Sequence, residues 1–184
     1  MNQVLDKLLC ERYPKIFANR YEDATVTAMC WGFDCGDGWF NILDQLCSQI
    51  QHHIDWKTSQ YERAERYNQA LTKAVAGDRA ELIEYFCYGK AADNKTFENV
   101  ESEIKRNQLR ELPEQVPQVV ADQVKEKFGT LSFYYTGGDE RTAGMVALAD
   151  GMSAVTCECC GSPAEIRYGS WVRTLCNTCV KETA

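Results

Sequence analysis

Four cysteines near the C-terminal end constrain this chain more than any other feature. Cys157 and Cys160 form one C-x2-C pair, and Cys176 and Cys179 form a second pair after a gap of fifteen residues. This spacing is typical of structural zinc sites. Each pair directs two thiolates from one tight turn toward a common point, and two such turns complete a tetrahedron around Zn2+. The sequence therefore predicts one structural zinc ion held by these four cysteines.

The residues between the two pairs predict a zinc ribbon. Residues 165–168 and 171–175 are rich in strand formers, and Gly169-Ser170 between them suits a two-residue hairpin turn. So small a module has few apolar residues, so we expect metal binding to contribute to its folding. Four thiolates close the coordination sphere, whereas a catalytic zinc keeps one position open. Cys159 is expected to lie outside that sphere if Cys157 and Cys160 are both ligands; its exchange into the sphere is the alternative.

Residues 30–40 form the second unusual stretch, because three glycines, two aspartates, two cysteines and four large aromatic residues fall within eleven positions. Two interpretations remain open. The aromatic residues could anchor the start of a helix to the core. Alternatively the stretch is a binding surface, in which Trp31 and Trp39 supply contact area and Asp34 and Asp37 accept hydrogen bonds or bind a cation.

Other reactive side chains give weaker signals. Cys30, Cys35 and Cys47 could be combined with His52 or His53 into a second zinc site, but their spacing matches no standard ligand pattern. Buried cysteine as a small apolar residue is the more common case. The two histidines lie in no context that suggests a metalloprotease, a deaminase or a catalytic triad. The sequence predicts no catalytic residue, and the chain is expected not to be an enzyme.

Hydrophobic periodicity predicts an α+β fold. Helices are expected over residues 3–17, 39–56, 60–76, 78–87, 97–109 and 140–153, and a short strand or extended connector over residues 24–29. Asp37 and Asp139 are expected to cap the helices that follow them.

Strand formers in residues 116–125 and 131–135 predict a hairpin with Gly129 in its turn, although residues 119–128 could also form a helix. We expect three parts: a helical region over residues 1–115, the hairpin and helix of residues 116–155 packed on it, and the zinc-ribbon module of residues 156–184.

Composition and charge restrict the partners and the compartment. The chain of 184 residues carries a formal charge of −7 and is 45% hydrophobic. An acidic chain does not adhere non-specifically to nucleic acid or to anionic membranes. It contains no apolar run long enough for a membrane span, and its first twenty residues do not have the pattern of a signal peptide. We expect a cytoplasmic protein with reduced cysteines.

Three blocks together resemble a known family. Residues 30–40, residues 119–131 and the segment from Cys157 to Cys179 are similar to small uncharacterised proteins encoded by tailed phages and prophages. In this chain the second pair reads Cys-Asn-Thr-Cys, whereas many members of that family end this motif with histidine. The resemblance implies a phage origin and expression in the cytoplasm of a bacterial host. It implies no activity and no catalytic residues.

These observations lead to three functional hypotheses. The first is a non-enzymatic zinc-ribbon protein that binds a host or phage macromolecule, most simply a protein, as an accessory or anti-defence factor. The second is nucleic-acid binding by the ribbon and hairpin through exposed aromatic residues and the cations Lys125, Lys127, Arg167 and Arg173. The third is a small-ligand or nucleotide binder, or an enzyme, centred on Asp34, Asp37 and Asp122.

Overall fold

The α+β fold class is confirmed by the computed structural model, which describes residues 1–87 and 89–183. The chain forms two compact units, one made of Met1–Ile54 and Val116–Ala184 and the other of Asp55–Gln115. This division differs from the expected boundaries at residues 115 and 155, because residues 1–54 share one core with the hairpin and the helix that follow residue 115. No helix in the described ranges combines the length and the apolar character that a membrane span requires.

The first unit begins with helix α1 (Gln3–Arg12), which is shorter than the expected range of 3–17. The side chain of Asn2 caps its first turn, and the helix ends just before Pro14, whose ring does not fit a helix interior. No strand forms at residues 24–29. Thr27 instead caps the short 3-10 helix η1 (Ala28–Trp31), because its hydroxyl accepts a hydrogen bond from the amide of Met29.

Helix α2 (Phe40–Val75) is one continuous helix of 36 residues where the sequence predicted two. Residues 57–60 contain neither glycine nor proline, so their polar character does not interrupt the helix. Residues 40–54 belong to the first unit, and residues 55–75 belong to the second. The 3-10 helix η2 (Asp37–Trp39) leads into α2. Asp37 does not cap α2 as expected, because its carboxylate accepts hydrogen bonds from the backbone and side-chain nitrogens of Asn2.

The predicted hairpin is confirmed, and the helical alternative for residues 119–128 is wrong. Strand β1 (Val120–Lys127) pairs antiparallel with β2 (Thr130–Thr136), and the bulge lies between Ala121 and Gln123. The turn residues Phe128 and Gly129 have φ values of 55° and 88°. Two successive positive φ angles are the geometry that matches the twist of a two-residue hairpin.

The outer edge of β1 is covered by residues from the N-terminal part of the same unit. The amide of Asp34 donates to Val124 O at 3.0 Å, and the amide of Glu126 donates to Asp34 O at 2.7 Å. Ala121 N donates to Ile16 O at 2.8 Å. These bonds attach the stretch of residues 30–40 to the hairpin.

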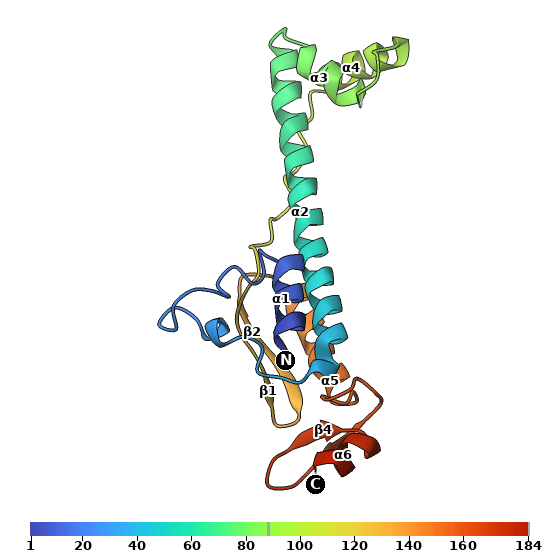
Figure 1. Cartoon of the computed structure of the whole chain (residues 1–184). Coiled ribbons are helices and arrows are strands. Elements are labelled where there is room, and N and C mark those ends of the chain that lie inside the picture. Colours follow the sequence, from blue (N-terminus) through green and yellow to red (C-terminus); the bar gives the residue numbers. More distant parts are fainter. Residues whose placement is uncertain (88, 184) are drawn as a thin grey trace. The chain divides into compact units, whose positions relative to one another are not determined.

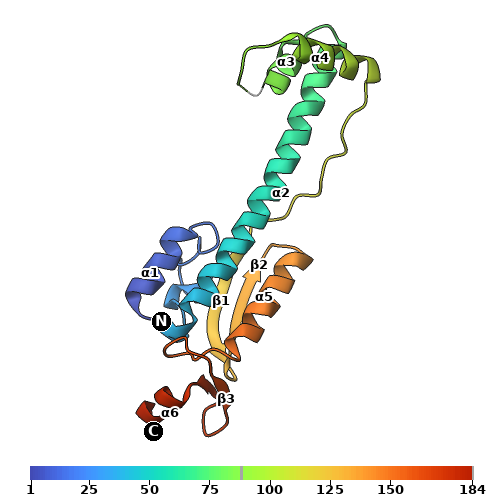
Figure 2. The ribbon, with the colours of Figure 1, turned by 90° about the vertical axis from the view of Figure 1, so that its right-hand side faces the viewer.

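Helix α5 (Glu140–Ser153) covers the other strand, and both its range and its cap at Asp139 are confirmed. Figure 2 shows α5 running alongside β2. The hydroxyl of Ser153 accepts from Leu131 N at 2.7 Å, which ties the end of α5 to the start of β2. The shared core includes the buried side chains Leu9, Ile16, Met29, Trp39, Leu43, Ile50, Val119, Val124, Leu131 and Phe133.

A buried histidine holds the start of α5. His53 Nε2 lies 2.8 Å from Asp139 Oδ2, while the other oxygen of Asp139 accepts from the amide of Thr142. Burial opposes ionisation of this carboxyl, but the hydrogen bonds from His53 and Thr142 outweigh it and lower the pKa of Asp139 to about 2. The carboxylate therefore stabilises the folded state while it stays ionised.

This pair predicts a pH-dependent difference between the wild type and Asp139→Asn. The folded-state pKa lies below the ordinary value of 3.8, so the stabilisation is fully present above pH 3.8 and is lost as pH falls toward about 2. We expect the wild type to be the more stable protein at neutral pH and the difference to shrink over that acidic window. Urea midpoints of both proteins between neutral pH and pH 2 measure it. A difference that stays constant over this range would contradict the assignment.

The C-terminal ribbon consists of β3 (Glu165–Arg167), β4 (Arg173–Leu175) and helix α6 (Asn177–Thr183). Arg167 pairs with Arg173, so residues 168–172 form a five-residue loop in place of the expected two-residue turn. Trp171 lies in this loop, and its indole Nε1 donates to Glu126 Oε2 beside the β1–β2 turn at 3.3 Å. In Figure 1 this C-terminal module, drawn in red, lies next to the turn between β1 and β2.

The second unit is helical. It contains residues 55–75 of α2, α3 (Ala80–Cys87) and α4 (Asn94–Arg106), around a separate small core that includes Tyr67, Leu71, Leu82, Tyr85 and Val100. The guanidinium of Arg110 lies 3.7 Å from the centre of the Tyr67 ring and donates to Tyr85 OH at 2.6 Å. These contacts attach the segment after α4 to this core.

Candidate metal centre

The four predicted cysteines come together in space. The Sγ atoms of Cys157, Cys160, Cys176 and Cys179 all lie within 4.8 Å of one another. Cys160 Sγ and Cys176 Sγ are 3.7 Å apart. A tetrahedron with metal–sulfur bonds of about 2.3 Å has edges of about 3.8 Å. The group can therefore hold a metal ion without a large rearrangement.

Backbone turns place the sulfur atoms. In the first pair, Gly161 N donates to Cys157 O at 2.8 Å, and Cys157 N donates to Ser162 O at 2.7 Å. In the second pair, Cys179 N lies 3.4 Å from Cys176 Sγ, at the start of α6. Each pair is thus held by its own amide groups, and the bond from Cys179 N to Cys176 Sγ also favours the thiolate form that a metal requires.

Local hydrogen bonds already shift some of these thiols toward thiolate. The side chain and backbone amide of Ser162 lower the pKa of Cys160 to about 6. The amide of Cys179 is the main cause that lowers the pKa of Cys176. Sharing protons with the neighbouring sulfurs raises the pKa of Cys179. Four sulfur donors around one point form a soft ligand set that suits Zn2+.

The stretch of residues 30–40 packs directly against the first cysteine pair. A Cβ atom on Gly38 would lie 2.1 Å from Cys157 O and 2.5 Å from Gly161 N, and one on Gly36 would lie 2.2 Å from Glu158 O. The amide of Gly38 donates to Glu158 O at 2.8 Å, and that of Gly36 to Glu158 Oε1 at 3.0 Å. These two glycines are needed for close approach of two backbones, since neither has a left-handed φ.

Trp39 completes this contact. Its side chain is fully buried, and its indole Nε1 donates to Thr156 O at 2.8 Å. Residues 36–39 therefore pack against residues 156–161, which contain the first cysteine pair, and we call this the loop–knuckle contact.

The structure separates the four residues that the sequence grouped as a binding surface. Trp39 is buried, and the exposed carboxylate of Asp37 accepts hydrogen bonds from the backbone and side chain of Asn2. Trp31 is 75% exposed, and with Asp34 it lines a small recess of about 230 Å3. Of the four, only Trp39 is buried, and a role of Trp31, Asp34 and Asp37 in binding stays a prediction.

The remaining candidates do not gather into a second site. Among the residues that the structure describes, the group of four C-terminal cysteines is the one set of three or more ligands close enough for a metal, so Cys30, Cys35 and Cys47 form none. Burial raises the pKa of the Cys35 thiol to about 12 and also raises that of Cys47. Neither Asp34, Asp37 and Asp122 nor the histidines complete such a group.

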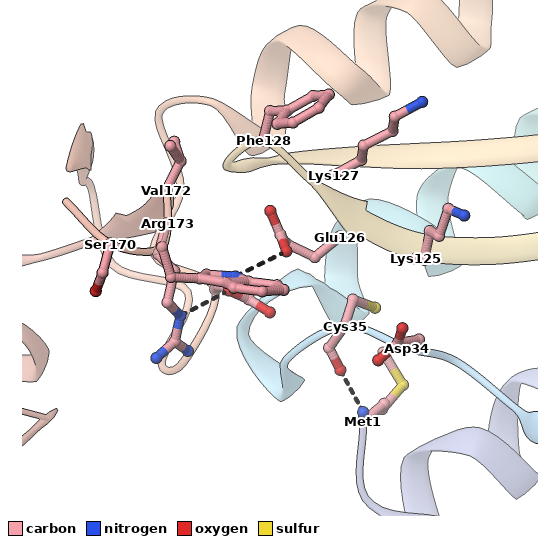
Figure 3. A pocket seen from close by; sticks show the side chains of 12 residues that line it. Met1, Asp34, Cys35, Lys125, Glu126, Lys127, Phe128, Ser170, Val172 and Arg173 are labelled. Atoms are coloured by element: carbon pink, nitrogen blue, oxygen red, sulfur yellow. Dashed lines mark hydrogen bonds and ion pairs between the residues drawn. The ribbon is translucent and has the colours of Figure 1, made fainter. Parts of the chain in front are cut away.

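A larger recess lies beside the metal centre, between the β1–β2 turn and the loop of the ribbon (Figure 3). Its volume is about 660 Å3, and Lys125, Lys127, Phe128, Trp171 and Arg173 are among the residues that line it. The sequence indicated Lys125, Lys127 and Arg173 as candidate binding residues, but it did not indicate Phe128, which lies in the predicted turn. One feature could have revealed Phe128: it stands directly before Gly129, at a position where hairpin turns favour asparagine or aspartate.

Comparisons of this chain with models of protein families, with curated proteins and with solved structures find no match. Its function is therefore inferred from geometry and chemistry.

Proposed function

We propose that this chain is a non-enzymatic zinc-ribbon protein that binds a protein partner of bacterial or phage origin in the cytoplasm. In this proposal Cys157, Cys160, Cys176 and Cys179 hold one structural Zn2+. The four donors leave no position open for a substrate. The metal fixes the ribbon, and the partner binds elsewhere, in a groove between α2 and α5.

The groove is the observation that supports a protein partner. It has a volume of about 260 Å3 and is lined by Asn41, Ile42, Gln45, Leu46, Gln49, Met145, Leu148, Ala149 and Met152. Leu148 is 65% exposed, and Met152 is also exposed. Apolar side chains gathered in a concave site mark interaction surfaces more often than scattered ones do.

The chemistry of the groove indicates which partner fits. Its lining positions recur every three or four residues along two helices, so the groove follows the helix axes. No charged residue among those that the structure describes lines it, and its polar lining residues Asn41, Gln45 and Gln49 carry neutral amides. An amphipathic helix with apolar anchors and uncharged flanks suits such a groove. Methionine side chains at Met145 and Met152 adapt to the shape of those anchors.

Affinity capture with a matched pair of variants tests this proposal. Leu148→Glu places a charge in the groove, whereas Val26→Glu alters an apolar residue of the same exposed fraction outside it. We expect a bacterial protein to bind the wild type and Val26→Glu, and to bind Leu148→Glu at least about tenfold more weakly, because a buried unpaired charge opposes binding. Titration of the purified partner measures the dissociation constants.

Two results would overturn the proposal. One is an intact, folded wild type that captures no protein whose binding depends on Leu148. The other is a Leu148-dependent dimer of the chain alone in sedimentation equilibrium, which would make a second copy the occupant of the groove.

A further inference from the structure

Exposed aromatic side chains gather around the 660 Å3 recess beside the metal centre. Phe128 at the tip of the β1–β2 turn is 76% exposed, and Trp171 in the ribbon loop is 71% exposed. Tyr134 on β2 is exposed as well, and so is Tyr168, which lies in the same ribbon loop as Trp171. None of these rings contributes to the cores, so packing does not explain their presence.

Hydrogen bonds connect the turn that carries Phe128 with the loop that carries Trp171. Glu126 accepts from Gly129 N at 2.6 Å through one oxygen and from the Trp171 indole through the other, and Figure 3 marks the second bond. The hydroxyl of Thr174 also donates to Gly129 O. Phe128 has a φ of 55°, which costs energy for a bulky side chain. A strained and exposed ring on a fixed turn points to a role in binding.

Two lysine side chains lie close to the rings of Tyr134 and Phe128. Lys125 Nζ lies 5.4 Å from the centre of the Tyr134 ring, and Lys127 Nζ lies 5.7 Å from that of Phe128. Neither lysine makes an ion pair with any described residue. Lys127 Nζ donates to Tyr134 OH at 3.4 Å, a neutral partner that leaves its charge unpaired, so both ammonium groups can attract an anionic ligand.

One pair of opposite charges in the recess is neutralised within the protein. Glu158 accepts from Gly36 N and pairs with Arg173 at 3.4 Å, while Glu126 bonds Gly129 and Trp171. Arg167, a cation that the sequence also suggested for nucleic acid, pairs with Glu165 at 2.8 Å. Among the described residues, the unpaired cations that line the recess are thus Lys125, Lys127 and the N-terminal ammonium of Met1, which donates only to backbone carbonyls. They face the carboxylates of Asp34 and Glu126, so cations outnumber anions by one.

We propose that this aromatic–lysine surface, made of Lys125, Lys127, Phe128, Tyr134 and Trp171, binds single-stranded nucleic acid by stacking bases on its rings. Stacking is indifferent to sequence and supplies much of the affinity for single strands. It therefore does not require a strongly basic protein, which agrees with the net charge of −7. A duplex hides its base faces and offers mainly phosphates, for which two lysines are too few. Lysine is depleted at protein interfaces, which makes a polypeptide a poorer fit.

Fluorescence anisotropy of labelled oligothymidylate and oligouridylate, each of about ten nucleotides, tests the proposal on the zinc-loaded full chain. Stacking does not read the sugar, so we expect both strands to bind with similar affinity and a matching duplex to bind at least about tenfold more weakly. Two phosphate contacts predict a slope of log K against log salt of about −1.4. Lys125→Gln combined with Lys127→Gln should bring that slope close to zero.

Variants of the rings separate binding from folding. Trp171→Ala removes an exposed ring and is expected to weaken binding about tenfold or more. Phe128→Asn should weaken binding while the protein becomes no less stable, because asparagine adopts positive φ more readily. Tyr21→Ala, which removes a comparably exposed ring from outside the surface, and Leu148→Glu in the groove are expected to leave binding unchanged.

Four outcomes would overturn this inference. They are no binding of either strand by the folded protein at about 0.05 M salt, binding that survives Trp171→Ala and Phe128→Asn, a duplex that binds as tightly as a single strand, and polyglutamate that competes as well as the oligonucleotides. The last outcome would make the surface a site for acidic polypeptides. Each result is independent of whether a protein binds the groove between α2 and α5.

Discussion

Replacing Gly38 by alanine is expected to destabilise the first unit by about 3 kcal/mol. The added methyl group would meet Cys157 O at 2.1 Å and Gly161 N at 2.5 Å. Both are backbone atoms of the turn that carries the metal ligands, so they cannot move aside as the end of a flexible side chain can. Relief requires separation of the loop–knuckle contact, which breaks the bond from Gly38 N to Glu158 O and the bond from Trp39 to Thr156 O.

Urea unfolding with a matched control measures this effect. Gly144 and Gly151 lie in helix α5 with no atom within 4 Å of an added Cβ. Gly144→Ala is therefore expected to raise the stability by roughly 0.5–1 kcal/mol, because alanine favours helix. Replacement of glycine by alanine is thus expected to lower the stability at Gly38 and to raise it at Gly144. Equal urea midpoints for Gly38→Ala and the wild type would show that the loop–knuckle contact does not form.

Removal of the metal is expected to unfold the ribbon while the rest of the first unit stays folded. The buried cluster of the ribbon consists of Cys157, Leu175 and Cys179, so two of its three members are proposed ligands. So small a core cannot hold β3, β4 and α6 without the metal. The larger core of the unit contains no residue of the ribbon and should survive.

Cys176→Ser tests the same point without a chelator. We expect metal analysis to give about one zinc per chain for the wild type and close to none for this variant. Cys159→Ser is the control, since Cys159 lies outside the group and its sulfur is 3.5 Å from Arg173 Nη2. Hydrogen exchange should show loss of protection in residues 156–181 of Cys176→Ser alone. A full zinc content in Cys176→Ser would contradict the assignment of the ligands.

Local signals in the sequence were sufficient for several elements. The spacing of the four cysteines predicted their convergence, because each short turn determines where its own two sulfur atoms point. Helix α5 was predicted with its cap, since Asp139 follows two glycines and precedes an apolar pattern. The alternating pattern of strand-forming residues at positions 131–135 predicted β2.

Contacts between distant segments were not predictable in the same way. The glycines of residues 30–40 suggested conformational freedom, but Gly36 and Gly38 serve close packing against residues 157–161, a partner that no local pattern reveals. The continuous α2 was missed because residues 57–60 are polar, and polarity alone does not end a helix. The ribbon loop of five residues carries Trp171 to Glu126 beside the other hairpin, a contact between segments far apart in the sequence that the local turn signal Gly169-Ser170 does not reveal.

The loop–knuckle contact also has a consequence for the order of folding. Its bonds join residues separated by 117 and 122 positions in the chain. Contacts between residues so far apart in the sequence have a large entropic cost of loop closure, and they tend to form late in folding. Residues 30–40 leave the ribosome well before residues 156–161, so the contact cannot form until that later segment has been synthesised. We therefore expect the hydrogen bond from the Trp39 indole to the carbonyl oxygen of Thr156 to form in one of the last steps of folding.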